Sequence, residues 1–131
     1  MSRLRAVVIV FVVLMASAIG WIGYRLVYVW QHIPEAYAAW DAGTLLVEYM
    51  NSNENKWPSS WDDLLRILET DAGKAIPLRG RNPDELNYAG FLKQYVAINW
   101  TFNPTSGAVS NPVTRVDGKQ FPVVWEGAEP N

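Results

Sequence analysis

Near its N-terminus the chain carries a long apolar run with no charged interruption. Residues 6–24 read AVVIVFVVLMASAIGWIGY and contain no charged side chain. As a helix they would extend about 28 Å at about 1.5 Å per residue, close to the hydrocarbon thickness of a bilayer. The pattern therefore predicts a transmembrane helix over residues 6–24.

Charged and aromatic residues at the two ends of the run predict its orientation. Arg3 and Arg5 precede it, and this favours a cytoplasmic location for residues 1–5. We expect residues 25–34 to form an interfacial segment and residues 35–131 to lie outside the cytoplasm. Interfacial aromatic side chains and an arginine that reaches the headgroups are expected where the helix leaves the lipid, and these membrane-interface residues are Trp21, Tyr24, Arg25, Tyr28 and Trp30.

A cleaved signal peptide is the alternative interpretation of the same segment. Ala16-Ser17-Ala18 fits the small-x-small pattern of a cleavage site, and Arg3 and Arg5 fit a basic leader. Cleavage after Ala18 would release a secreted binding module. It would also leave the apolar sequence IGWIGYRLVYVW at the new N-terminus, in water, so we favour retention of the helix.

Small residues within the run suggest a way for the helix to find partners. Small side chains permit close approach of helices in lipid. Membrane lipid is one expected partner, because the segment is predicted to lie in the bilayer. Protein partners or self-association through the helix are the others. The helix-association residues are Ala16, Ala18, Gly20 and Gly23.

Residues 35–50 have the periodicity of an amphipathic helix. Pro34 either begins this helix or lies within one that continues from the membrane. Spacings of three and four predict a buried face with Ala36, Gly43 and Met50 beside it, and its residues are Ile33, Tyr37, Trp40, Thr44 and Val47. The acidic residues Glu35, Asp41 and Glu48 are expected to face water.

Two more helices are predicted after a polar turn at residues 51–56. Ser60 is a suitable N-cap for a helix over residues 60–70, with Asp63 placed to complete a capping box. A loop is predicted at residues 71–82. A second helix starts at Asn82, which precedes a proline and two acids, and extends to Lys93.

The period then changes to that of strands. Residues 95–102 are rich in β-branched and aromatic side chains, and residues 113–116 and 121–125 flank Asp117-Gly118, a typical hairpin turn. Three antiparallel strands are expected. The predicted fold class is α+β: an N-terminal transmembrane helix that continues into an amphipathic helix, short helices, and a small C-terminal antiparallel sheet.

The net charge of −2 is unevenly distributed. Three of the 11 Lys and Arg lie in the first thirty positions, where no acid occurs, so the rest carries eight of them against 13 acids. An acidic domain repels phosphates, so nucleic acid is not an expected partner.

Candidate chemistry is sparse. There is no cysteine, hence no disulfide and no thiolate. His32 is the single histidine, and Asp62 and Asp63 are adjacent helix positions whose side chains diverge by about 100°. We expect no catalytic residue, no metal site and no cofactor, and therefore not an enzyme.

Among the seven tryptophans, two are not placed by the periodicity of a predicted element. Trp40, Trp61 and Trp100 fall at apolar positions and are expected in the core. Trp57 and Trp125 lie near a turn and near the end of the chain. They are the candidate contact residues for a protein partner.

The order of these parts is similar to type IV pilins and to the pseudopilins of type II secretion. The specific likeness covers about residues 36–68. It rests on LLVEY at 45–49, NKWPS at 55–59 and DLL at 63–65, which resemble a helix ending in tyrosine, a polar turn, an aromatic-Pro pair and a short helix. The resemblance implies a pilin-like α+β domain that serves as a structural or interaction component of an envelope assembly.

The likeness does not extend to the pilin processing motif. That motif places a glycine before the apolar segment and a glutamate within it. In this chain no glycine precedes the run, and no acid occurs before Glu35.

Overall fold

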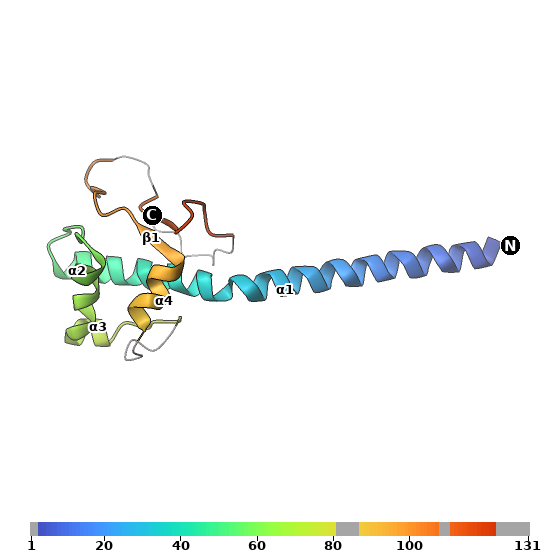
Figure 1. Ribbon diagram of the computed structural model, residues 1–131, viewed down its shortest axis with the longest axis horizontal. Helices are drawn as coiled ribbons and strands as arrows, with labels where there is room; N and C mark the ends of the chain where they lie inside the picture. The colour runs from blue at the N-terminus through green and yellow to red at the C-terminus, as the bar shows by residue number, and fades with distance from the viewer. Residues whose placement is uncertain (1–2, 81–86, 108–110, 123–131) are drawn as a thin grey trace. The chain divides into compact units, whose positions relative to one another are not determined.

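Helices come first along the chain and two short strands follow, so the fold is α+β as the sequence predicts (Figure 1). The structure is a computed structural model that describes residues 3–80, 87–107 and 111–122. The predicted helix start at Asn82 and the end of the predicted last strand, with Trp125, lie outside the described residues. The chain divides into two compact units, Met1–Ile33 and Pro34–Asn131. We call the second unit the C-terminal domain.

Helix α1 extends from Arg3 to Ser52 and contains both predicted helical segments. Pro34 lies inside it, so the chain adopts the continuous alternative and not a fresh start. Proline has no N–H, and the helix therefore lacks the bond that residue 34 would give to the carbonyl of Trp30. Two acids and several small or branched residues of α1 are buried in the C-terminal domain.

The predicted buried face of α1 is wrong. Ala38, Ala42 and Leu45 have no exposed surface, whereas Val47, expected inside, is 60% exposed. Residues two apart on a helix point to nearly opposite sides, so a face that contains Ala38 is nearly opposite one that contains Trp40. The large side chains of the predicted face dominated the pattern, while the small alanines are the residues that let α1 approach the core closely.

The acids of α1 were also expected in water, and two of them are buried. Glu35 is 7% exposed and Asp41 is not exposed at all, while Glu48 is half-buried. The physical reason is that later parts of the chain supply donors to both carboxylates, as described below. Buried charges are tolerated when they are paired or hydrogen-bonded in this way.

The predicted helix over residues 60–70 is confirmed as α2, Trp61–Leu65, followed by a 3₁₀ turn η1, Arg66–Glu69. Ser60 is the N-cap, and its Oγ accepts a hydrogen bond of 3.2 Å from the amide of Asp63. This bond satisfies one of the free amides at the helix start.

The second half of the predicted capping box is displaced by one residue. Asp63 Oδ2 accepts bonds from the amide of Ser59 at 2.9 Å, from the Ser59 hydroxyl at 3.1 Å and from the Tyr49 hydroxyl at 3.0 Å. The amide of Ser59 contributes most to holding the pKa of Asp63 below its ordinary value, and the Tyr49 and Ser59 hydroxyls add to the effect. Because Tyr49 belongs to α1, the carboxylate ties the start of α2 to the end of α1.

The loop predicted at residues 71–82 begins with one helical turn, α3, Asp71–Lys74. The sequence pattern does not predict this turn. Thr70 Oγ1 accepts from the amide of Gly73 at 3.0 Å and caps the turn. A side chain on Gly73 would run into the backbone of Ile67, so glycine lets α3 pack directly on η1.

Helix α4, Tyr88–Tyr95, lies within and just beyond the second predicted helix. It leads directly into β1, Val96–Ile98, which pairs antiparallel with β2, Val113–Arg115, so that Ile98 is opposite Val113. The predicted first strand is shorter than expected because the chain turns at Asn99, whose carbonyl accepts from the amide of Phe102 at 3.2 Å.

The described part of the sheet has two strands where three were expected. Asp117-Gly118 does form a turn: the Arg115 amide donates to the Lys119 carbonyl at 3.1 Å, and Gly118 has a φ of +76°. The chain does not continue as a strand through Phe121 and Pro122. Proline cannot donate to a strand ladder, in keeping with the lack of strand at these two residues, and residues 123–125 of the predicted strand lie outside the described residues.

The core lies entirely in the C-terminal domain. It joins one side of α1 to α2, η1, α4 and both strands, and partly buried aromatic rings surround it. Its buried residues are Ala38, Ala42, Leu45, Leu46, Leu64, Ile67, Tyr88, Phe91, Leu92, Val96, Ile98 and Val113.

Candidate functional site

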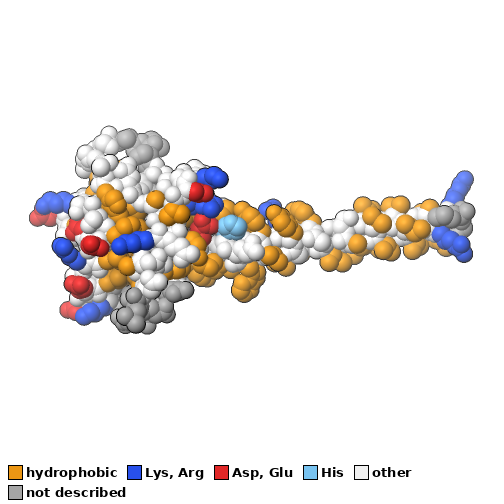
Figure 2. All heavy atoms as spheres, in the orientation of Figure 1, with side chains coloured by type: hydrophobic (Ala, Val, Ile, Leu, Met, Phe, Trp, Pro, Cys, Tyr) orange, Lys and Arg blue, Asp and Glu red, His pale blue; other side chains and the backbone are white. Residues whose placement is uncertain are grey.

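The N-terminal part of α1 presents apolar side chains on all sides. Among the described residues, α1 is the one helix that is long enough and apolar enough to cross a membrane. No part of its most apolar stretch is buried. Figure 2 shows hydrophobic side chains along this part of the helix. A soluble protein rarely exposes so continuous an apolar surface, because its transfer out of water is favourable. This surface is the strongest functional feature of the chain.

Three of the four expected helix-association residues lie together on that surface, and Ala18, two residues from Ala16 and Gly20, lies on nearly the opposite side. Ala16, Gly20 and Gly23 are four and three residues apart, which places them on one side of the helix. A methyl group added at Gly20 or Gly23 would meet no atom within 4 Å. Neither glycine is therefore required by packing within the chain, and a larger residue at either position leaves the fold undisturbed.

Trp21 and Arg25 of the expected membrane interface form a cation–π pair. The Arg25 guanidinium carbon lies 5.2 Å from the centre of the Trp21 ring. Trp21 is 62% exposed, so the pair sits on the helix surface. Stacking on the ring orients the charged group without neutralising it.

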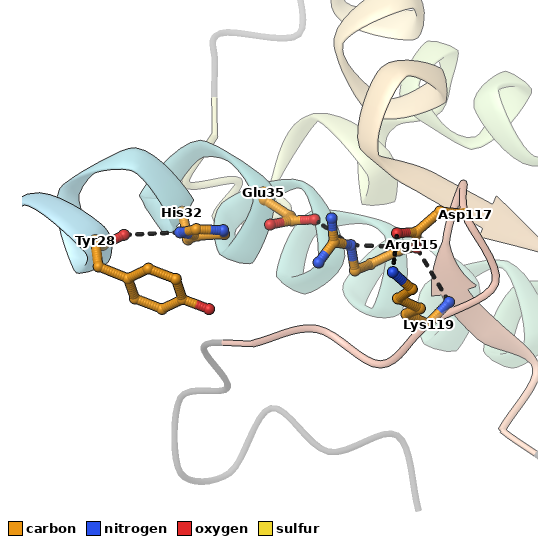
Figure 3. Close-up of polar contacts among 6 residues, drawn as sticks. All are labelled: Tyr28, His32, Glu35, Arg115, Asp117 and Lys119. Carbon is orange, nitrogen blue, oxygen red and sulfur yellow. Dashed lines mark hydrogen bonds and ion pairs between the residues drawn. The ribbon is translucent and has the colours of Figure 1, made fainter. Parts of the chain in front are cut away.

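A second group of interfacial residues forms a ladder of rings. The ring of Tyr28 lies 6.3 Å from that of Tyr24 and 4.3 Å from that of His32. His32 Nδ1 lies 2.7 Å from the carbonyl of Tyr28 (Figure 3). A carbonyl can only accept, so Nδ1 carries a proton and donates it. Trp30, the remaining interface residue, is 73% exposed.

In the C-terminal domain, charged side chains form an alternating chain between α1 and the turn after β2. Arg115 Nε lies 2.8 Å from Glu35 Oε1 and 3.4 Å from Asp117 Oδ1, and Lys119 Nζ lies 3.9 Å from Asp117 Oδ2 (Figure 3). Arg115 is thus shared between two carboxylates. These ion pairs fix β2 to α1. The acidic and basic groups pair with one another within the domain.

Asp41 is the most deeply buried charged residue that the structure describes. Its Oδ1 accepts from the Arg79 amide at 2.7 Å, and its Oδ2 accepts from the Gly80 amide at 2.8 Å and from the Tyr88 hydroxyl at 3.2 Å. Burial raises the pKa of Asp41, against the opposing effect of these bonds. Burial and the neighbouring carboxylate also raise the pKa of Tyr88.

The segment around Arg79 is fitted closely to this carboxylate. A side chain on Gly80 would run into the ring of Phe91 and into Asp41 itself. The Arg79 guanidinium stacks over Trp40, with its carbon 4.6 Å from the ring centre. Sequence reasoning missed this cluster because its members are 38 to 47 positions apart. Its role is to hold the segment before residue 81 against α1.

The candidate partner contact Trp57 is half-buried and engaged. Its Nε1 donates to the carbonyl of Asn99 at 2.9 Å, and its ring packs edge-on against Phe102. Trp61 and Trp100 form a similar edge-on pair at 5.4 Å; they were expected in the core, and they are half-buried and pack against it. Trp40, also expected in the core, is half-buried. Packing accounts for Trp57, and its contact with a partner stays a prediction. Trp125, the other candidate, is outside the described residues.

Comparisons of the chain with models of protein families, with curated proteins and with solved structures find no match. What the structure itself shows is a loose likeness to pilins: a long apolar N-terminal helix, short helices and a small antiparallel sheet. Within residues 3–80, 87–107 and 111–122, no three acidic or histidine side chains are grouped to hold a metal ion.

Proposed function

We propose that the chain is a single-pass membrane protein in which residues 6–24 cross the bilayer. The observation that carries this proposal is the wholly exposed apolar surface of α1 over that segment. Ten of its residues are Val, Ile, Leu or Phe, and on an insertion scale these contribute roughly −3 to −6 kcal/mol. In lipid a helix also satisfies its own backbone hydrogen bonds.

The charges on either side of the segment support an orientation. Arg3 and Arg5 favour a cytoplasmic N-terminus, and the C-terminal domain with its acidic balance is then outside the cytoplasm. Arg25 opposes this bias by one charge. We propose that its pairing with Trp21 holds it at the interface on the outer side.

Within that arrangement we propose that the domain is a pilin-like structural or interaction component of an envelope assembly and not an enzyme. The order of elements and the likeness at residues 36–68 support this role. Without the pilin processing motif, assembly would depend on other contacts. The open surface at Ala16, Gly20 and Gly23 supplies one for helix pairing, and the domain supplies a second through residues such as Trp57 and Trp125.

Membrane insertion is tested by extraction and by protease protection. Full-length protein should stay with the membrane in alkaline carbonate and be released by detergent. Protease added outside intact cells or spheroplasts should digest the C-terminal domain and leave a protected N-terminal fragment. Release into carbonate without detergent would overturn the proposal, and protection of the domain would reverse the orientation.

The secreted binding module is separated from the anchored protein by N-terminal sequencing. A mature chain that starts at Ile19 means cleavage after Ala18. The structure lends support to retention, because cleavage would leave Ile19, Trp21 and Ile22 at least 52% exposed in water. An intact Met1 or Ser2 terminus is the expected result.

Helix association is tested by enlarging the two glycines. In a reporter of membrane-helix dimerisation, G20L together with G23L should weaken the signal several-fold, because large side chains prevent close approach. Since neither position contacts another part of the chain, the substitutions leave the fold intact. V12L on the same helix is the control, and an unchanged signal in G20L/G23L would remove this mechanism.

A further inference from the structure

Five residues at the end of the apolar run form a single stripe on α1. Spacings of three and four place them within about 100° of arc around the helix, at 3.6 residues per turn. We call them the aromatic-cationic stripe: Trp21, Tyr24, Arg25, Tyr28 and His32. Trp30, the other aromatic residue of the expected interface, lies on the opposite side of the helix.

Contacts along the stripe orient its polar groups. Arg25 stacks over Trp21, and Tyr28 lies between Tyr24 and His32 in the ring ladder. The bond from His32 Nδ1 to the Tyr28 carbonyl fixes the imidazole, so that Nε2 is the nitrogen left to face outward. The stripe therefore presents a guanidinium, two phenols and an imidazole edge on one surface.

The charge of the stripe lacks a counterion within its own unit. Arg25 is the single Lys or Arg between residues 6 and 55, and no acid occurs in residues 1–34. A guanidinium offers five N–H donors and pairs with a phosphate through two parallel bonds. The missing anion must come from outside this part of the chain.

The side of the helix next to the stripe is aliphatic. Ile22, Leu26 and Val29 also follow spacings of four and three, and they are exposed. A molecule with an anionic head and hydrocarbon chains matches both surfaces at once. Its head would meet Arg25, and its chains would lie along the aliphatic side chains.

We propose that the aromatic-cationic stripe is a binding site for one anionic phospholipid of the outer leaflet, with its phosphate on Arg25. This inference rests on the proposed membrane insertion of residues 6–24. Tyr28 contributes a hydroxyl donor to the headgroup oxygens, and His32 Nε2, the acceptor nitrogen of this tautomer, accepts from a headgroup hydroxyl. A zwitterionic lipid fits less well, because its ammonium group would find no acid in this part of the chain.

Lipid retention tests the site directly. Full-length protein in detergent micelles is mixed with equal phosphatidylglycerol and phosphatidylcholine, and retained lipids are counted by native mass spectrometry. The wild type should retain one phosphatidylglycerol in preference to phosphatidylcholine. R25Q should lower that retention about tenfold, because it removes two parallel charge-assisted hydrogen bonds to the phosphate. W21L should lower it about threefold through loss of the cation–π contact.

Trp30 supplies a matched control. It is an exposed tryptophan nine residues after Trp21, which places it on the opposite side of the helix. W30L should therefore leave the retained phosphatidylglycerol unchanged. Equal retention of the two lipids, no effect of R25Q, or a loss in W30L as large as that in W21L would each overturn the site.

A second measurement separates failure of the site from failure of the proposed function. All variants are reconstituted with phosphatidylcholine vesicles and floated on a density gradient after a carbonate wash. Flotation of the wild type without a lipid preference leaves membrane insertion standing and refutes the site. A wild type that does not float refutes insertion, and the lipid site with it.

Discussion

Asp41 shows how one side chain organises a distant segment. Its carboxylate satisfies the amides of Arg79 and Gly80 and the hydroxyl of Tyr88, all inside the C-terminal domain. We expect D41A to lower the free energy of unfolding by about 2–4 kcal/mol, because it leaves several buried donors without an acceptor. Thermal or urea unfolding of the full chain in detergent, followed by near-ultraviolet circular dichroism, measures the change.

Asp62 provides the comparison for that substitution. It is exposed, and Lys93 Nζ lies 3.9 Å from its Oδ1 at the surface. D62A should change stability by no more than about 0.5 kcal/mol. Equal effects of D41A and D62A would show that the bonds of Asp41 contribute little.

Two carboxyl groups should give opposite responses to acid. Burial raises the pKa of Asp41 above its ordinary value of 3.8, so the folded state binds the proton more tightly and gains stability as pH falls through the raised value. Hydrogen bonds lower the pKa of Asp63, so its contribution is present above 3.8 and is lost as pH falls through the lower folded value.

Neutral variants isolate these responses. On acidification from neutral pH, the stability of the wild type should rise relative to D41N and fall relative to D63N. Unfolding midpoints measured from pH 7 to about pH 3 give both differences. The same sign for the two variants would contradict the assignment of at least one shift.

The sequence did not predict that acidic residues of α1 are buried. A helical period assigns charged residues to water, since they are almost never buried without partners. For Asp41 and Glu35 the partners lie far along the chain, at Arg79, Tyr88 and Arg115. Ser60 was identified correctly as a cap because its partner is three residues away.

Among the elements, α1 and β2 are joined by an ion pair of intermediate burial. The Glu35 side chain is 9% exposed and that of Arg115 is 28% exposed. We expect E35Q to cost about 2 kcal/mol, between the values for exposed and buried pairs. Because the pair is shielded from solvent, the cost should persist in high salt.

The surface pair of Glu54 and Lys56 serves as a reference for E35Q. Both side chains are at least 75% exposed. E54Q should have almost no effect in low salt and none in high salt. Urea unfolding at two salt concentrations measures all four values, and a loss in E35Q that disappears with salt would argue against a shielded pair.

Elements with local signals were predictable, and those that depend on distant contacts were not. The helix start at Ser60 and the turn at Asp117-Gly118 follow from short-range chemistry, and both are present. The buried side of α1 depends on which surface the sheet and α4 cover. A strand beyond Lys119 depends on a partner strand, and the two described residues of the predicted one, Phe121 and Pro122, are not in a strand.

At the scale of the molecule, the core and the apolar segment belong to separate units. Among the described residues, every buried one lies at or beyond Glu35. We therefore expect a fragment that begins at Pro34 to fold and stay soluble without the preceding helix. Proline is well suited to the first position of a helix, where its missing N–H costs nothing.

The fragment's unfolding is the measurement. It should be monodisperse by size-exclusion chromatography and unfold cooperatively, with a near-ultraviolet spectrum like that of the full chain. A fragment starting at Ala42 is the control, because it removes Ala38, Glu35 and Asp41 and should not fold. Aggregation of both fragments would mean that residues before Pro34 contribute to the folded domain.

The apolar N-terminal segment and the order of helices and strands could be predicted from the sequence for a simple reason. A run of uncharged residues such as 6–24 constrains its own environment, whatever the rest of the chain does. The α+β order of elements follows from changes of period along the chain and is confirmed. The location of the domain and its partner depend on other molecules, and they stay predictions.

Pro34 gives α1 a mechanical property. The carbonyl of Trp30 has no helical donor at position 34, so one rung of the ladder is missing in the middle of a 50-residue helix. If the chain is pulled from both ends, we expect this turn to unwind before any other. Unwinding at this turn would lengthen the chain under force, so that the two strands of the sheet stay paired.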